Sequence, residues 1–243
     1  MNYIGHSIPF NEQSFFENAD RSIHSDFFPL SIIDREGRIR CRVPRSSATG
    51  SNDKRKTAEH DACVWYRYAA FLGIVPFLDL AKQKHIFDME SLRFLVEESW
   101  FVPNDRKETF LKGIVAGFNQ DWPSAMHLLM PQVENAIRCL AQDCGIVVYK
   151  TYPDGVEECL SLSSILDMPE VAEYLDEKLL FNMRVFFTSE YGIGMRNMVC
   201  HGLLADDEYE EIDSILVWGF VLFLCCISNW CLQSDSLTSE NNG

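Results

Sequence analysis

The run ILVWGFVLFLCCISNWCL at residues 215–232 is almost wholly apolar, and it constrains the fold more than any other feature of the sequence. Its unbroken part is shorter than the roughly 20 residues that a membrane-spanning helix needs, and it ends in Ser228 and Asn229. A helix that is apolar on all sides must be buried on all sides. The run therefore predicts a helix in a protein core or in an interface between two copies of the chain, with a membrane helix as the less favoured alternative.

Helical patterns fill most of the chain from about Lys56 onward. The clearest begins at Asp121, which can cap a helix with Pro123 in its first turn, and ends at Gly145. Apolar residues recur along it at spacings of three and four, which lines up one apolar stripe. Pro131 lies inside this pattern and should kink or interrupt the helix. Further helices are expected at 57–83 with a break near Pro76, at 88–101, 105–120 and 176–190, and from about Asp167–Pro169.

Two stretches have the pattern of β-hairpins. Residues 31–43 place two β-prone runs around Arg35–Glu36–Gly37, and residues 146–162 do so around Pro153–Asp154–Gly155. We therefore expect a mainly α protein with two short β-hairpins.

The net charge of −15 argues against a protein that coats nucleic acid by bulk electrostatics, because phosphate binding needs a positive surface. Residues 31–56 have the opposite polarity, with eight Lys or Arg against three Asp or Glu. This stretch is a solvated hairpin and loop, or a local surface that holds RNA.

The nine cysteines form no C-x-x-C pair, which is typical of reduced thiols in a cytoplasmic protein. The first ten residues lack the pattern of a signal peptide. Because no Cys/His cluster has the spacing of metal ligands, neither a metal nor another cofactor is expected.

The segment Arg196–Asn197–Met198–Val199–Cys200–His201–Gly202 carries the residues best suited to chemistry. Histidine can accept or donate a proton near neutral pH, and the permanently charged fork of arginine can hold a phosphate. These are the two groups needed to activate the 2′-hydroxyl of RNA against its neighbouring phosphate without a metal. Asn197 could orient the phosphate or the imidazole. The alternative interpretation is an ordinary junction between helices, in which Arg196 and His201 are hydrogen-bonded polar residues without a catalytic role.

The spacing limits how these residues can cooperate. Positions five apart on a helix differ by roughly 140° in direction, so Arg196 and His201 converge poorly on one straight helix. A bend at the motif, or a second copy across a dimer axis, would bring them together. Cys200 and His201 are adjacent, so their side chains diverge and do not form a nucleophile pair.

The motif resembles that of the HEPN (higher eukaryotes and prokaryotes nucleotide-binding) superfamily, in which an arginine and a histidine are separated by four to six residues. It is most similar to a domain-of-unknown-function family marked by an RNxxxHG string, which also includes the endoplasmic-reticulum-membrane-associated RNA degradation protein. An upstream pattern of that family, hLLxPQxExxLR, is matched by HLLMPQVENAIR at 127–138. The resemblance covers about residues 105–230.

The resemblance implies a HEPN-like helical bundle with an N-terminal helical extension. The expected regions are 1–104 with a hairpin, a basic loop and helices, 105–232 as the HEPN-like domain, and 233–243 as a polar tail. It further implies a homodimer whose two motifs meet in a cleft.

The activity implied is that of a metal-independent endoribonuclease that leaves a 2′,3′-cyclic phosphate. Arg196, Asn197 and His201 would be its catalytic residues. The protein would be a toxin or antiviral defence effector, with a regulatory or antitoxin partner as a further possibility. The alternatives are a noncatalytic RNA-binding or dimerisation module, and a membrane-peripheral RNA-degradation factor.

Three further residues are candidates for orienting the motif or contacting RNA. Glu134 and Arg138 are four apart on one helix, so an intrahelical salt bridge is the default, and a role beside Arg196 is the alternative. Gly202 would let the backbone approach closely.

Overall fold

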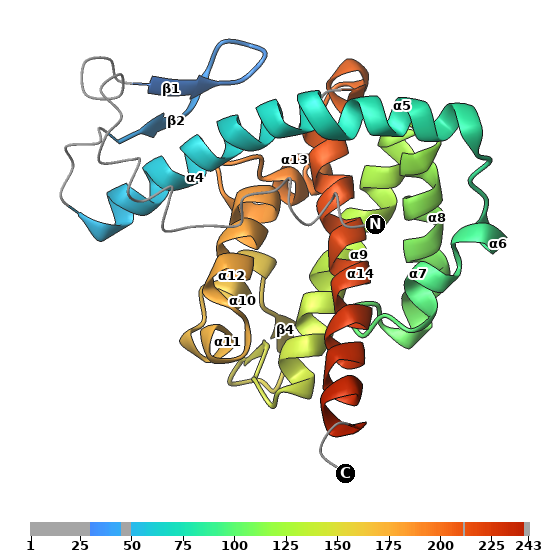
Figure 1. Cartoon of the computed structure of the whole chain (residues 1–243). Coiled ribbons are helices and arrows are strands. Elements are labelled where there is room, and N and C mark those ends of the chain that lie inside the picture. The colour runs from blue at the N-terminus through green and yellow to red at the C-terminus, as the bar shows by residue number, and fades with distance from the viewer. Residues whose placement is uncertain (1–29, 45–49, 211, 241–243) are drawn as a thin grey trace.

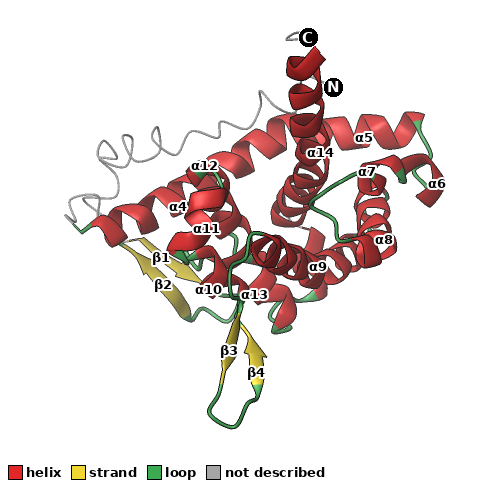
Figure 2. Cartoon of the chain, turned by 90° about the horizontal axis from the view of Figure 1, so that it is seen from below, coloured by secondary structure: helices red, strands yellow, loops and turns green. Residues whose placement is uncertain are grey.

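The computed structural model describes residues 30–44, 50–210 and 212–240, and it confirms a mainly helical fold with two antiparallel hairpins. The strands are β1 (Leu30–Ile33), β2 (Ile39–Val43), β3 (Tyr149–Thr151) and β4 (Glu157–Cys159). β1 pairs with β2 and β3 with β4, around the two turns that the sequence predicts (Figure 2).

The first half of the chain contributes α4 (Ser51–Ala69), a π-helical turn η1 (Ala70–Ile74), α5 (Val75–Lys84), α6 (Met89–Leu92), α7 (Phe94–Glu97), a 3₁₀ turn η2 (Asn104–Arg106) and α8 (Lys107–Phe118). α4, η1 and α5 follow one another without a break and form a single long rod across the molecule (Figure 1). The expected helix at 88–101 is instead two helices of four residues each. The chain tightens at Arg93, whose N–H bonds three residues back to Glu90, while Leu92, Leu95 and Val96 on the two sides of this turn are buried.

The second half contributes α9 (Trp122–Asp143), α10 (Leu162–Leu166), α11 (Pro169–Tyr174), α12 (Glu177–Met183), a π-helical turn η3 (Arg184–Thr188), α13 (Met195–Cys200), a 3₁₀ turn η4 (Asp206–Glu210) and α14 (Ile212–Glu240). α9 lies in the middle of the bundle and contacts α8, α10, α13 and α14 (Figure 1).

Pro131 does not interrupt α9, contrary to the sequence expectation. Proline removes the hydrogen bond to the carbonyl four residues earlier, which belongs to His127. Both residues are exposed, so water can satisfy that carbonyl. Met126 and Met130 before Pro131, and Val133 after it, are all buried on the opposite side of the helix. Their packing keeps the parts of α9 before and after Pro131 collinear.

The apolar helix α14 is covered by its own chain in its described part. Leu216, Val217, Trp218, Phe220, Val221, Leu224 and Cys225 are all buried. α14 contacts α4, α7, α8, α9, η1 and η3, so its described part is a core helix, which is one of the two alternatives that the sequence left open. A second copy is not needed to cover these residues, so a dimer needs another basis. The backbone of α14 also continues to Glu240, through most of the expected polar tail.

Trp218 of α14 marks the centre of the packing. Its indole Nε1 donates to the carbonyl of Ile114 in α8 at 3.1 Å, and its ring meets Phe118 and Trp122 edge-on at centroid distances of 4.7 and 6.0 Å. One hydrophobic core runs from Ala58 to Cys225. The expected boundary between residues 104 and 105 therefore lies inside this shared core.

Candidate active site

A tight turn of two glycines positions the motif helix α13. An added Cβ at Gly192 would lie 2.4 Å from the carbonyl oxygen of Val185, and one at Gly194 would lie 2.7 Å from that of Ser189. Gly194 also has a φ of +61°, which disfavours other residues. The N–H groups of Ile193 and Gly194 both donate to the Val185 carbonyl, at 2.8 and 3.3 Å. The turn that leads into α13 thus packs directly against the backbone of η3.

A third glycine ends the helix. Gly202 has a φ of +62°, its N–H donates to Val199, and the N–H of Leu203 donates to Met198. This is the hydrogen-bond pattern of a Schellman cap. An added Cβ at Gly202 would meet nothing within 4 Å, so no close approach of backbone requires this glycine. Its structural role is to terminate α13 directly after His201.

Arg196 points toward α9 and forms an ion pair with Glu134. Its Nε donates to Glu134 Oε2 at 2.7 Å, while Arg138 Nη2 donates to Glu134 Oε1 at 3.1 Å. The three side chains are only 21%, 13% and 15% exposed for Arg196, Glu134 and Arg138. Glu134 therefore makes both the intrahelical salt bridge and the contact with the motif that the sequence left as alternatives.

Asn197 ties the motif back to η3. Its Oδ1 accepts from Arg196 Nη1 at 3.3 Å, and its Nδ2 donates to the Thr188 carbonyl at 3.3 Å. Two of the three guanidinium nitrogens of Arg196 are thus engaged. Its Nη2 makes no hydrogen bond to the described part of the chain, so the two N–H groups of that nitrogen are available to a ligand.

His201 is exposed and makes no side-chain hydrogen bond to any residue that the structure describes. α13 is one helix from Met195 to Cys200, and the His201 N–H still donates to Asn197. The chain therefore does not bend between Arg196 and His201, and their side chains do not meet within one copy. Burial raises the pKa of the Cys200 thiol, which disfavours the thiolate that a nucleophile needs. This agrees with the expectation that Cys200 does not act as a nucleophile.

The basic hairpin β1–β2 lies beside the motif at both of its flanks. Cys41 Sγ donates to the carbonyl of Glu190, and Arg35 pairs with Asp207 at 2.5 Å. Sequence reasoning singled out this stretch for its charge, but its position next to residues 190 and 207 follows only from the tertiary structure.

Acidic residues neutralise much of this basic stretch. Arg38 pairs with Asp34 and Glu36, and Arg55 lies within 4 Å of carboxylates of Glu59 and Asp167. Arg40 and Arg42 are exposed on the same side of β2 and form no ion pair with the described residues. Arg45 lies outside the described residues.

A buried glutamate near the motif was missed by sequence reasoning. Glu59 of α4 is 3% exposed, and its Oε2 accepts from Ser189 Oγ at 2.6 Å. Burial raises the pKa of this carboxyl, and the contacts with Ser189 and Arg55 only partly offset that effect. Ser189 Oγ accepts in turn from the Tyr191 N–H, so Glu59 helps to hold the turn that precedes α13.

Two surface cavities lie away from the motif. One of about 450 Å³ is lined by residues 97–104 and the last turns of α9, and one of about 330 Å³ by residues 144–147 and α11. Neither contains a motif residue. Within the described residues, no three His, Cys, Asp or Glu side chains are placed to share a metal ion.

No protein-family model, curated protein or solved structure matches this chain.

Proposed function

We propose that this protein is a metal-independent endoribonuclease with Arg196 and His201 as its catalytic residues. The observation that carries the proposal is the arrangement of α13 and its C-cap. Glu134 fixes Arg196, whose Nη2 has no hydrogen bond to a described residue, and His201 is exposed. A fixed cation and an exposed imidazole thus lie within one short segment, α13 and the residue that caps it, and this supports the proposal.

The chemistry requires three events. His201 accepts the proton of a 2′-hydroxyl, the 2′-oxygen attacks the adjacent phosphorus, and the bond from phosphorus to the 5′-oxygen breaks. The 5′-oxygen takes up a proton, so the products are a 2′,3′-cyclic phosphate and a 5′-hydroxyl. Arg196 Nη2 would donate to the phosphate oxygens, whose negative charge grows in the transition state.

Glu134 and Arg138 support this role without touching the reacting atoms. Glu134 fixes the orientation of the Arg196 guanidinium through Nε, and Arg138 offsets the negative charge of Glu134. With two arginines and one glutamate, the cluster keeps a net positive charge for the phosphate. Arg138 Nε is buried without a hydrogen bond to any described residue, so this cluster is not fully satisfied.

The second candidate function is RNA binding without turnover. It is favoured by one observation, that Arg196 and His201 point apart within a single copy. Cleavage would then need His201 of one copy to act with Arg196 of another, or a substrate long enough to contact both.

The test is cleavage of a labelled single-stranded RNA in EDTA. We expect products that end in a 2′,3′-cyclic phosphate, and no cleavage of the same strand with 2′-O-methyl groups. Arg196→Ala and His201→Ala should each reduce the rate by at least about a hundredfold, as expected for loss of an acid–base group or a phosphate donor. Glu134→Gln should reduce it about tenfold, since it acts only through Arg196.

His85→Ala is the matched control, because His85 is also exposed and caps the C-terminal end of α5. Melting temperatures of all variants show whether they fold. RNA that binds but stays intact at every enzyme concentration would favour the second candidate, and cleavage that disappears in EDTA would contradict the mechanism.

A further inference from the structure

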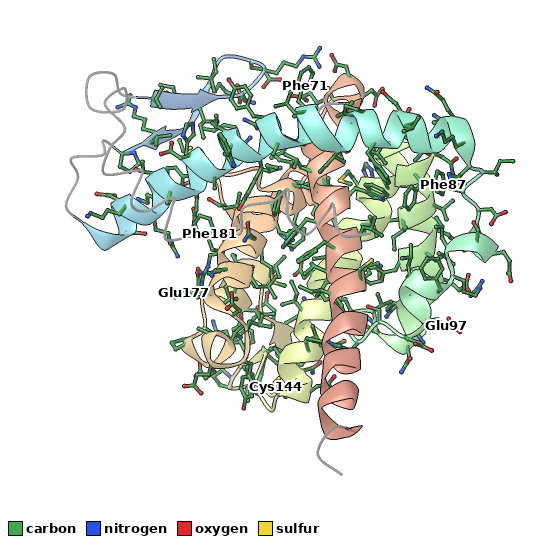
Figure 3. The ribbon with its side chains drawn as sticks, in the orientation of Figure 1. Phe71, Phe87, Glu97, Cys144, Glu177 and Phe181 are labelled. Atoms are coloured by element: carbon green, nitrogen blue, oxygen red, sulfur yellow. The ribbon has the colours of Figure 1, made fainter. Side chains whose placement is uncertain are left out.

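The rod formed by α4, η1 and α5 exposes a continuous apolar stripe on its outer side. Phe71 projects from the edge of the rod that faces away from the bundle (Figure 3). Six large side chains between 49% and 75% exposed make up the stripe, namely Trp65, Tyr68, Phe71, Leu72, Phe77 and Leu80. An exposed apolar patch of this size marks an interaction surface.

The π-helical turn η1 keeps these side chains on one side of the rod. In an α-helix, residues five apart diverge, but one π turn brings residues i and i+5 into line. The Val75 N–H donates to the Ala70 carbonyl with this spacing. Leu72 and Phe77 therefore continue one stripe across the junction of the two α-helices.

The inner side of the same rod is part of the protein core. Ala58, Ala62, Cys63, Tyr66, Ala70 and Leu78 are buried there. Between residues 62 and 81 the only charged residues are Arg67, which pairs with Asp213, and Asp79, which accepts from Gln120. By length and composition Asn52–Lys84 is also the only described helix that could span a membrane. Its inner face is part of the core, and its outer face has no partner within the described ranges 30–44, 50–210 and 212–240.

We infer that a second copy of this chain covers the stripe, with the two rods antiparallel about a two-fold axis near Leu72 and Gly73. This inference is independent of the proposed ribonuclease activity, and it places the contact on a different surface from α14.

The area of the stripe suits such a pair. Large apolar and aromatic side chains each offer about 150–250 Å². The exposed fractions of the six stripe residues therefore amount to an area on the order of 700 Å². A stable interface buries about 800 Å² on each partner, so this stripe with its immediate surroundings is large enough.

The sequence of the stripe is self-complementary in the antiparallel direction. About a centre between Leu72 and Gly73, Trp65 is opposite Leu80 of the second copy, and Tyr68 is opposite Phe77. Leu72 is then opposite Gly73, where an added Cβ meets nothing within 4 Å, so the second copy finds open space at the centre. Large residues thus face large ones along the stripe, and the small residue lies where the rods approach most closely.

The charges at the two ends agree with the same axis. Asp61 lies one turn before Trp65, and Lys84 lies one turn after Leu80, so both continue the stripe. They are equidistant from its centre, which puts Asp61 opposite Lys84 of the second copy at both ends of the pair. Within the described part of the single chain, the one ion-pair partner of Asp61 is His60, at 3.3 Å. By contrast, a net charge of −15 opposes an anionic lipid surface as the occupant.

The first experiment measures the mass of the full chain by sedimentation equilibrium across the micromolar range. We expect a dimer, and we expect Tyr68→Glu with Leu72→Glu to raise its dissociation constant at least about a hundredfold, because two charges per copy would be buried. Val147→Glu with Val156→Glu is the matched control, since both residues are exposed and lie outside the rod. A wild-type monomer throughout this range, or a dimer that the Tyr68 and Leu72 substitutions leave intact, overturns the inference.

The second experiment tests the antiparallel arrangement by exchanging charges. Asp61→Lys and Lys84→Asp should each weaken the dimer, by about tenfold, because each places two like-charged pairs at its ends. The double variant should restore the wild-type affinity. Failure of the double variant to recover overturns the arrangement. Binding of the monomer to phosphatidylcholine vesicles through the same stripe would also overturn the inference, with lipid as the occupant.

Discussion

Glu134 lies between two arginines and orients the one that belongs to the motif. Its contact with Arg196 joins residues 62 positions apart in sequence, while its contact with Arg138 spans one helical turn. A carboxylate that accepts from two guanidinium groups holds both side chains in a fixed direction. The Arg196 guanidinium is therefore held in one orientation, as its proposed contact with phosphate requires.

Glu59 leads to a prediction about the pH dependence of stability. Burial raises the pKa of its carboxyl in the folded protein above its usual value of 4.5. The folded state then binds more protons than the unfolded state between these two values, so this residue lowers stability as pH rises through that window. Below the window Glu59 is protonated in both states, and above it the cost is constant.

Glu59→Gln should remove this dependence, because glutamine mimics the protonated acid and still accepts from Ser189. We expect the free energy of unfolding of the variant to exceed that of the wild type by an amount that grows with pH from 4.5 and then levels off. Urea denaturation of both proteins from pH 4 to 8 measures the difference. A constant difference over this range would contradict the raised pKa.

At the scale of the elements, α8 and α14 approach each other closely at one glycine. Gly117 of α8 lies against the indole of Trp218, and an added Cβ would be 2.1 Å from its Nε1. Since the same nitrogen is hydrogen-bonded to Ile114, the ring cannot move away without losing that bond.

Gly117→Ala should therefore destabilise the protein by about 3 kcal/mol, as expected for overpacking of a rigid site. Gly219→Ala in α14 is the matched control, because its added Cβ would only touch Ile74 at 3.8 Å. That change should stabilise the helix by about 0.5–1 kcal/mol, through the lower backbone entropy of alanine in the unfolded chain. Thermal and urea denaturation measure the change in stability for each variant. Equal changes for Gly117→Ala and Gly219→Ala would show that α8 and α14 move apart easily to accommodate the added methyl group.

At the scale of the whole molecule, charge limits how RNA can bind. The chain carries −15, so an RNA strand is repelled by most of its surface. The hairpin β1–β2 holds Arg40 and Arg42, which have no described ion pair, next to the flanks of the motif. We expect RNA to contact the protein there.

Arg40→Gln with Arg42→Gln should weaken RNA binding and make it less sensitive to salt. Each phosphate contact on a single strand contributes about 0.7 to the slope of log affinity against log salt, so the slope should fall by about 1.4. Arg38→Gln is the control, because Arg38 already pairs with Asp34 and Glu36. Fluorescence anisotropy at several salt concentrations provides the slopes, and an unchanged slope in the double variant would place the RNA elsewhere.

Local signals in the sequence were sufficient for many elements. The turns at Gly37 and Gly155 give the two hairpins, Asp121 caps α9 through the N–H of Ser124, and Pro169 starts α11. These depend on residues within a few positions of each other, so their physical causes are visible in the sequence. The helix expected at 88–101 was wrong in its extent, because the chain forms only Met89–Leu92 and Phe94–Glu97. Leu92, Leu95 and Val96 have the spacing of one continuous helix, so their apolar pattern does not reveal the break at Arg93.

For the candidate site too, some features follow from the local sequence and others only from tertiary contacts. The sequence by itself determined that Arg196, Asn197 and His201 occupy one short segment, and that glycines flank it. Only the tertiary structure decided that Glu134 binds Arg196, that the basic hairpin lies beside the motif, and that α14 is enclosed by its own chain while α4 and α5 are not. An apolar pattern states that a surface must be covered, but which surface covers it depends on how all the helices share one core.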